Sequence, residues 1–216
     1  MGTHPEISES RPREMGISPE ILPLMPSADW FGSLLMRVGH GEDIKEAILS
    51  ANTGLNPKEY GRFRLLGSRE RELVCSVALE GGGRQLRNLE SFRSLRLSGH
   101  GEWQRMHLGS MESVLGRMPY YRHIEERIGS IYEEAKEGTL LIDFNTAIFQ
   151  SLYSFLMKNI GSDELKGFYG NRLLQERGKE IAGRIRGEIS VLEAISQYGR
   201  DTLLGLLVRG IPSKQL

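Results

Sequence analysis

The alternation of hydrophobic and polar residues divides the chain into a strand-rich part and a helical part. Ser27 precedes a helical period that places Trp30, Leu34 and Val38 on one face, so a helix is predicted to begin at this N-cap. Four short extended segments are predicted after it: E-A-I-L-S-A (46–51), Y-G-R-F-R-L-L-G (60–67), E-L-V-C-S-V-A-L (72–79) and S-F-R-S-L-R-L-S-G (91–99).

The links between these segments favour antiparallel pairing. G-S-R-E-R (67–71) predicts a hairpin turn, and G-G-G-R-Q (81–85) predicts a longer, mobile loop. Both links are too short for the helical crossover that parallel strands need.

From Glu102 onward the period is helical. Helices are predicted over 102–116, about 120–136, about 143–160, about 163–195 and 200–209. The stretch 163–195 contains five glycines, each costing about 1 kcal/mol against alanine in a helix interior, so it could be bent or broken. Strands followed by helices predict an α+β fold. We expect a flexible leader over 1–20 and one domain over 21–212, strand-rich at about 44–99 and helical at about 102–210.

Charge and composition exclude several classes of partner. Lysine plus arginine equals aspartate plus glutamate at 28 each, so no global field favours nucleic acid or an anionic membrane. The basic run at 177–188 is diluted by acidic residues and lacks aromatics, which also argues against nucleic acid. No apolar run is long enough to span a membrane, and residues 1–20 lack the apolar core of a secretory signal. A cytoplasmic location is expected.

Residues that bind metals or cofactors show no suitable spacing. Cys75 is the only cysteine and is expected to be a buried core thiol. His40, His100 and His123 form no zinc-binding pattern, and G-G-G-R is neither a P-loop nor a dinucleotide fingerprint. We therefore expect no metal and no cofactor.

The helix predicted over 102–116 carries the candidate chemistry. Its apolar stripe contains Trp103, His107, Ser110 and Val114, with Gln104 and Met111 at the edge. Polar groups in such a stripe need hydrogen-bond partners or must face a cleft. His107 is thus either a general base or donor facing a cleft, or a core histidine satisfied by Ser110, Gln104 or a backbone carbonyl.

The motif W-Q-x-x-H-x-x-S-x-x-S (103–113), followed by P-Y-Y (119–121), resembles the signature of the WbqC-like protein family. The resemblance extends over roughly 20–212 and is strongest from Trp103 to Tyr132 and over L-L-I-D-F-N-T (140–146). These bacterial proteins are often encoded among polysaccharide and O-antigen biosynthesis genes. The resemblance implies acyl or aminoacyl (glycyl-type) transfer to an activated sugar, with a sugar-nucleotide or glycan-related small molecule as partner and a homo-oligomer as one possible assembly.

The resemblance leads to a set of candidate site residues. His107 and Gln104 are the predicted catalytic residues, and the predicted substrate-binding residues are Arg62, Trp103, Ser110 and Tyr121. An enzyme of this kind needs Arg62, as an anion clamp, together with Gln104, His107 and Tyr121 around one concave pocket.

Simpler structural roles stand beside these predictions. Arg62 could be a solvated strand residue, Ser110 could bond back to its own helix, and Tyr121 could pack a helix corner. Asp143 and Asn145 are expected to cap a helix start, and the alternative is that this helix entry lines the same cleft as His107.

Departures from the family pattern favour a second hypothesis, a non-catalytic binding or assembly protein. Gly61 stands where related proteins have asparagine. Toward the C-terminus, Thr202 stands where serine is usual, Gly205 where aspartate is usual, and Arg209 where asparagine is usual.

Overall fold

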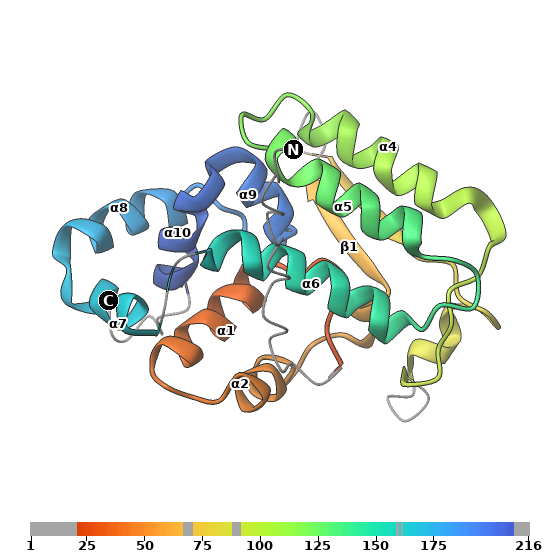
Figure 1. Cartoon of the computed structure of the whole chain (residues 1–216), viewed down its shortest axis with the longest axis horizontal. Helices are drawn as coiled ribbons and strands as arrows, with labels where there is room; N and C mark the ends of the chain where they lie inside the picture. The colour runs from red at the N-terminus through yellow and green to blue at the C-terminus, as the bar shows by residue number, and fades with distance from the viewer. Residues whose placement is uncertain (1–20, 67–70, 88–91, 159, 161, 210–216) are drawn as a thin grey trace, which may run out of the picture.

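The computed structural model describes residues 21–66, 71–87, 92–158, 160 and 162–209. The described strands form one antiparallel pair, which Figure 1 shows packed among the helices at one end of the molecule. The first elements are α1 (Ala28–Gly39), α2 (Ile44–Ala51), η1 (Pro57–Tyr60), β1 (Arg62–Leu66), β2 (Glu72–Ser76), η3 (Gly83–Arg87) and η4 (His100–Glu102). The later elements are α4 (Trp103–Leu115), α5 (Arg122–Glu134), α6 (Leu141–Met157), α7 (Ser162–Gly170), α8 (Arg172–Ala182), α9 (Val191–Tyr198), η5 (Gly199–Asp201) and α10 (Thr202–Arg209).

The predicted α+β class is confirmed, with the antiparallel strands preceding a mostly helical region. In the register of β1 and β2, Arg62 lies opposite Ser76 and Phe63 opposite Cys75. Within β1, burial alternates, so Phe63 and Leu65 face the core while Arg62 and Arg64 face the other side. The predicted hairpin turn at 67–71 lies largely outside the described residues.

Two of the four predicted extended segments were wrong. Residues 46–51 belong to α2, because the side chain of Asp43 accepts a hydrogen bond from the Lys45 amide and so caps a helix start. In the described part of the predicted segment 91–99, residues 92–99 take part in isolated bridges, Leu79 to Leu97 and Arg96 to Leu140, and form no continuous strand. The G-G-G-R-Q stretch, predicted as a loop, enters the 3-10 turn η3.

The helical predictions agree with the structure except at 163–195. That stretch is divided into α7, α8 and α9 because new helix starts interrupt it. Asn171 caps α8 by accepting hydrogen bonds from Leu173 and Leu174, and Ser190 caps α9 by accepting one from Leu192. The five glycines of this segment had indicated that the predicted helix could be bent or broken.

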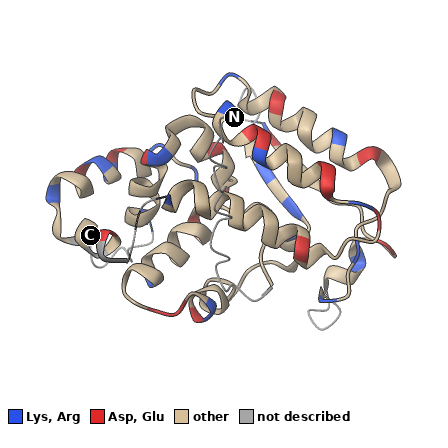
Figure 2. Ribbon diagram, viewed as in Figure 1, with Lys and Arg blue, Asp and Glu red and all other residues tan. Residues whose placement is uncertain are grey.

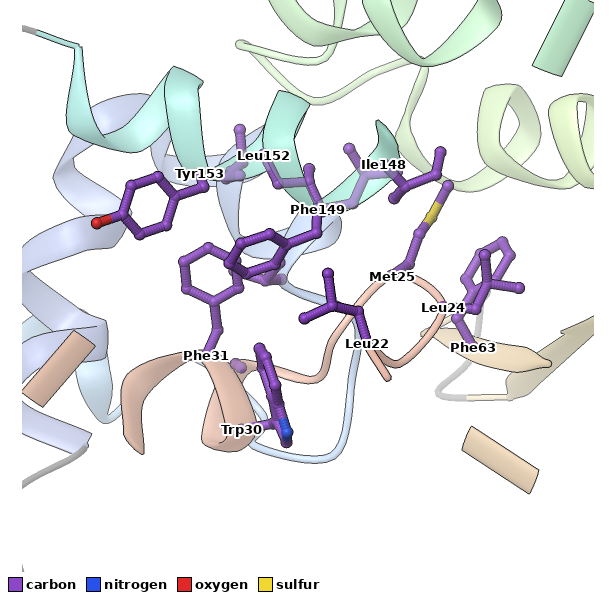
Figure 3. Packing of buried hydrophobic residues seen from close by; sticks show 14 of the residues in the cluster. Leu22, Leu24, Met25, Trp30, Phe31, Phe63, Ile148, Phe149, Leu152 and Tyr153 are labelled. Atoms are coloured by element: carbon purple, nitrogen blue, oxygen red, sulfur yellow. The ribbon is translucent and has the colours of Figure 1, made fainter. Parts of the chain in front are cut away.

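The core connects the N-terminal segment to α6. Figure 3 shows Trp30 and Phe31 of α1 lying against Phe149 and Tyr153 of α6, with Leu22 and Met25 beside them. The ring centroids of Phe31 and Phe149 are 5.6 Å apart, and those of Trp30 and Phe149 are 6.0 Å apart in an edge-on arrangement.

Helices α8 and α10 approach closely at two glycines. A Cβ atom on Gly178 would lie 2.7 Å from the carbonyl oxygen of Leu204, and one on Gly205 would lie 2.8 Å from Cγ2 of Ile181. Neither position can carry a larger side chain without separating the helices. The packing of this chain therefore explains the glycine at position 205.

Candidate functional site

Helix α4 lies over the core face of the strands and turns a buried stripe toward them. The buried members are Trp103, His107, Met111 and Leu115. Ser110 and Val114, predicted within the stripe, are only partly buried, so the stripe is rotated toward Met111 from its predicted position. Gly116 ends the helix as predicted, its amide bonding to the carbonyl of Glu112.

Both ring nitrogens of His107 are engaged inside the protein. Nε2 lies 3.0 Å from the carbonyl oxygen of Ser76 in β2, and Nδ1 lies 3.1 Å from the hydroxyl of Tyr132 in α5. A carbonyl can only accept, so Nε2 carries the proton and Nδ1 accepts from the Tyr132 hydroxyl. The imidazole thus links β2 to α5 beneath α4.

The protonation of His107 follows from its burial. The residue is 3% exposed and stacks edge-on against Phe63, with ring centroids 5.3 Å apart. Desolvation lowers the pKa of His107 to about 4, although the hydrogen bond to Ser76 opposes the shift. A neutral ring with no free nitrogen is poorly suited to general-base catalysis at neutral pH.

Arg62 does not meet His107. Because Phe63 contacts the His107 ring and neighbouring strand residues point to opposite faces, Arg62 lies on the far face of β1. There its Nη2 is 2.9 Å from Oε1 of Glu59, a carboxylate that also receives Arg64. The structure does not assemble the predicted base and anion clamp around one pocket.

Ser110 lies next to the buried thiol of Cys75. Burial raises the pKa of Cys75, and a hydrogen bond from Ser110 only partly offsets that rise. A thiol whose pKa is raised by burial lacks the ionised character of a cysteine nucleophile. The position of Cys75 agrees with the expected core thiol.

Trp103 packs in the core. Its indole Nε1–H donates to the carbonyl of Ser98 at 2.9 Å, and its ring lies 5.7 Å from that of Phe144. Only 5% of the residue is exposed, so little of it is accessible to a substrate.

Gln104 and Tyr121 line a common open groove between α4 and α5, with a volume of about 1130 Å³. Tyr132, the partner of His107, contributes to the same wall. The amide Nε2 of Gln104 donates to the carbonyl of Ala135 at 2.6 Å. Two of the predicted residues therefore meet at one concave surface, with His107 buried beneath it.

The groove is acidic. Five glutamates line it against Arg105 and Lys136, and Figure 2 shows acidic residues on both helices. Arg122 at the rim pairs with two of the glutamates. Burial, with Glu125 and Glu112 nearby, raises the pKa of Tyr121 to about 12. The glutamates lining the groove are Glu112, Glu125, Glu126, Glu133 and Glu137.

The floor of the groove is open at Gly109 of α4 and Gly129 of α5. A Cβ atom on either glycine would meet nothing within 4 Å. Internal packing does not require glycine there, although glycine weakens a helix interior.

Asn145 has a structural role that was not predicted from the sequence. It is fully buried, and its Nδ2 donates to the carbonyls of Leu22 at 2.7 Å and Tyr60 at 2.8 Å. The prediction that it caps a helix start was wrong, because α6 begins at Leu141 without a side-chain cap. An asparagine among the apolar positions of a helix was the available signal.

Groups of histidine, cysteine and carboxylate residues that could hold a metal ion are absent from the described part of the chain. Among the described helices, none has the length and apolar character needed to cross a membrane.

A model of the WbqC-like protein family matches residues 60–166, which include both strands, α4, α5 and α6. The matched part of the chain, residues 60–166, is WbqC-like. The matched residues contain the groove and the His107 network. No curated protein and no solved structure matches the chain.

Proposed function

We propose that this WbqC-like protein binds a small glycan-related molecule carrying an ammonium group in the groove between α4 and α5. The observation that carries the proposal is the charge of the groove. Among the described residues, Glu126, Glu133 and Glu137 have no ion-pair partner. Unpaired carboxylates around a concave surface favour a cationic ligand.

The same charge disfavours the diphosphate of a sugar nucleotide in this groove. It suits an amino sugar or an aminoacyl group, both of which carry an ammonium group at neutral pH. The binding hypothesis is therefore better supported than general-base catalysis by His107. A cytoplasmic location and a homo-oligomeric state remain expectations from the sequence and the family resemblance.

Calorimetric titration with glucosamine, N-acetylglucosamine and glucose tests the proposal, because these sugars differ at the amino group. We expect saturable binding of glucosamine that is lost with the two neutral sugars. The double variant Glu126→Gln/Glu133→Gln should bind about 10-fold more weakly. Glu46→Gln/Glu80→Gln is the matched control, since both residues are exposed and neither lines the groove. Equal binding of all three sugars would contradict the proposal.

Aminoacyl transfer is the second candidate, favoured by the meeting of Gln104 and Tyr121 at the groove. An activated glycyl ester would be incubated with glucosamine and the protein, and the products analysed by mass spectrometry. Protein-dependent formation of glycylated sugar, reduced in Tyr121→Phe, would establish transfer. If glucosamine bound and no glycylated product formed, the results would support the binding function and contradict aminoacyl transfer.

A further inference from the structure

A second concave site lies between η1 and η3, away from the residues that line the α4–α5 groove. Its volume is about 420 Å³, and it is lined by Asn56, Pro57, Lys58, Gly83, Arg84 and Leu86. Two of these six residues are cationic and none is acidic. The site thus has the opposite charge to the groove.

Lys58 and Arg84 have no ion-pair partner in the described part of the chain. In three other cavities of the described chain, by contrast, each lining arginine is held by a carboxylate. Those pairs are Arg105–Glu102, Arg184–Glu180, Arg186–Glu188 and Arg64–Glu59. The two cations between η1 and η3 are therefore available to an external anion.

The fold fixes the two elements that carry these cations. In η1, the side chain of Asn56 accepts a hydrogen bond from the Lys58 amide at 3.0 Å. Before η3, Gly81 and Gly82 adopt φ values of 73° and 84°, a left-handed turn that favours glycine and directs the chain into η3. The G-G-G-R sequence thus serves to place Arg84.

Gly61 sets the distance between the two elements. A Cβ atom at this position would lie 2.9 Å from Cδ1 of Leu86, which is 7% exposed. The missing side chain lets Leu86 dock against the end of η1 and brings Arg84 to the same concavity as Lys58. Any larger residue at position 61 must push Leu86 away.

We infer that this concavity binds a phosphate group, either free or as the phosphomonoester of a small molecule. Arginine offers a planar fork of donors to phosphate oxygens, and lysine adds a compact positive charge. The inference does not depend on the ammonium ligand proposed for the groove. Each can fail while the other holds.

The test is calorimetric titration of the whole chain with inorganic phosphate, pyrophosphate and a hexose 1-phosphate at low ionic strength, with glucose as the uncharged comparison. We expect saturable binding of the phosphates that weakens as salt is added. Tighter binding of the hexose 1-phosphate than of inorganic phosphate would identify a phosphomonoester as the ligand, and the reverse order would identify the free anion.

The deciding variant is Lys58→Ala/Arg84→Ala. Because Lys58 and Arg84 are both exposed, this variant should still fold. Phosphate affinity should fall at least about 10-fold in this variant. The control Arg117→Ala/Arg127→Ala removes the same charge at exposed residues outside the site and should leave affinity within about 2-fold. Equal loss in both variants, or no saturable binding below about 10 mM in the wild type, would overturn the inference.

Discussion

His107 gives the protein a defined response to acid at the scale of a single residue. Its ordinary pKa of 6.5 is lowered to about 4 in the folded state. The unfolded chain therefore binds the proton more readily, and stability falls as pH decreases from about 6.5 toward 4. Above pH 6.5 the group contributes no pH dependence.

We expect this residue to remove about 3 kcal/mol of folding free energy between pH 7 and pH 4. The variant His107→Gln has no titrating ring. Between pH 7 and pH 4, its free energy of unfolding should therefore fall by about 3 kcal/mol less than that of the wild type. Urea unfolding of both proteins at several pH values measures the difference, and the carboxylates common to both cancel. If stability depended on pH in the same way in both proteins, the pKa of His107 would not be lowered by folding.

At the scale of elements, helix glycines fall into two groups that substitution should separate. Gly178 and Gly205 lie at the α8–α10 contact, where a Cβ atom would collide with neighbouring atoms. Gly109 and Gly129 face the open groove.

Gly178→Ala and Gly205→Ala should each destabilise the protein by about 1–3 kcal/mol through overpacking. Gly109→Ala and Gly129→Ala should each stabilise it by about 0.5–1 kcal/mol, because alanine favours a helix interior. Thermal unfolding of the four single variants measures both effects. Destabilisation by Gly109→Ala or Gly129→Ala would show that the groove closes on itself in solution.

At the scale of the whole molecule, Arg209 joins the end of α10 to the end of α8 and to α1. Its Nη1 donates to the carbonyls of Ala182 at 3.0 Å and Ile185 at 2.8 Å, and its Nε donates to Asp29 of α1 at 2.8 Å. The guanidinium thus satisfies the carbonyls at the end of α8 and holds that end against α1.

Arg209→Ala should lower stability by about 2 kcal/mol, because two carbonyls lose their donor. Asp29→Ala should cost less, since it removes a carboxylate that is largely exposed while the carbonyl contacts remain. Hydrogen exchange should show faster exchange of the last turn of α8 in Arg209→Ala alone. If the last turn of α8 exchanged equally fast in Arg209→Ala and Asp29→Ala, the stabilisation would come from the Arg209–Asp29 ion pair instead.

The sequence by itself determined the elements whose periodicity is local. The β1–β2 pair, α4, α5 and the α+β class follow from alternation, helical spacing and turn residues within short windows. Where a short apolar run fits both a strand and a helix, the prediction was wrong. Residues 46–51, predicted as an extended segment, belong to a capped helix.

Only the tertiary structure decided what the candidate site residues do. The hydrogen-bond partners of His107 are Ser76 and Tyr132, which lie 31 and 25 residues away in the sequence. Asn145 donates a hydrogen bond to the carbonyl of Leu22, which lies 123 residues away. No local period encodes such pairings. They arise because the helices and strands bury their apolar faces together, and that packing turned Arg62 and His107 to opposite sides of β1.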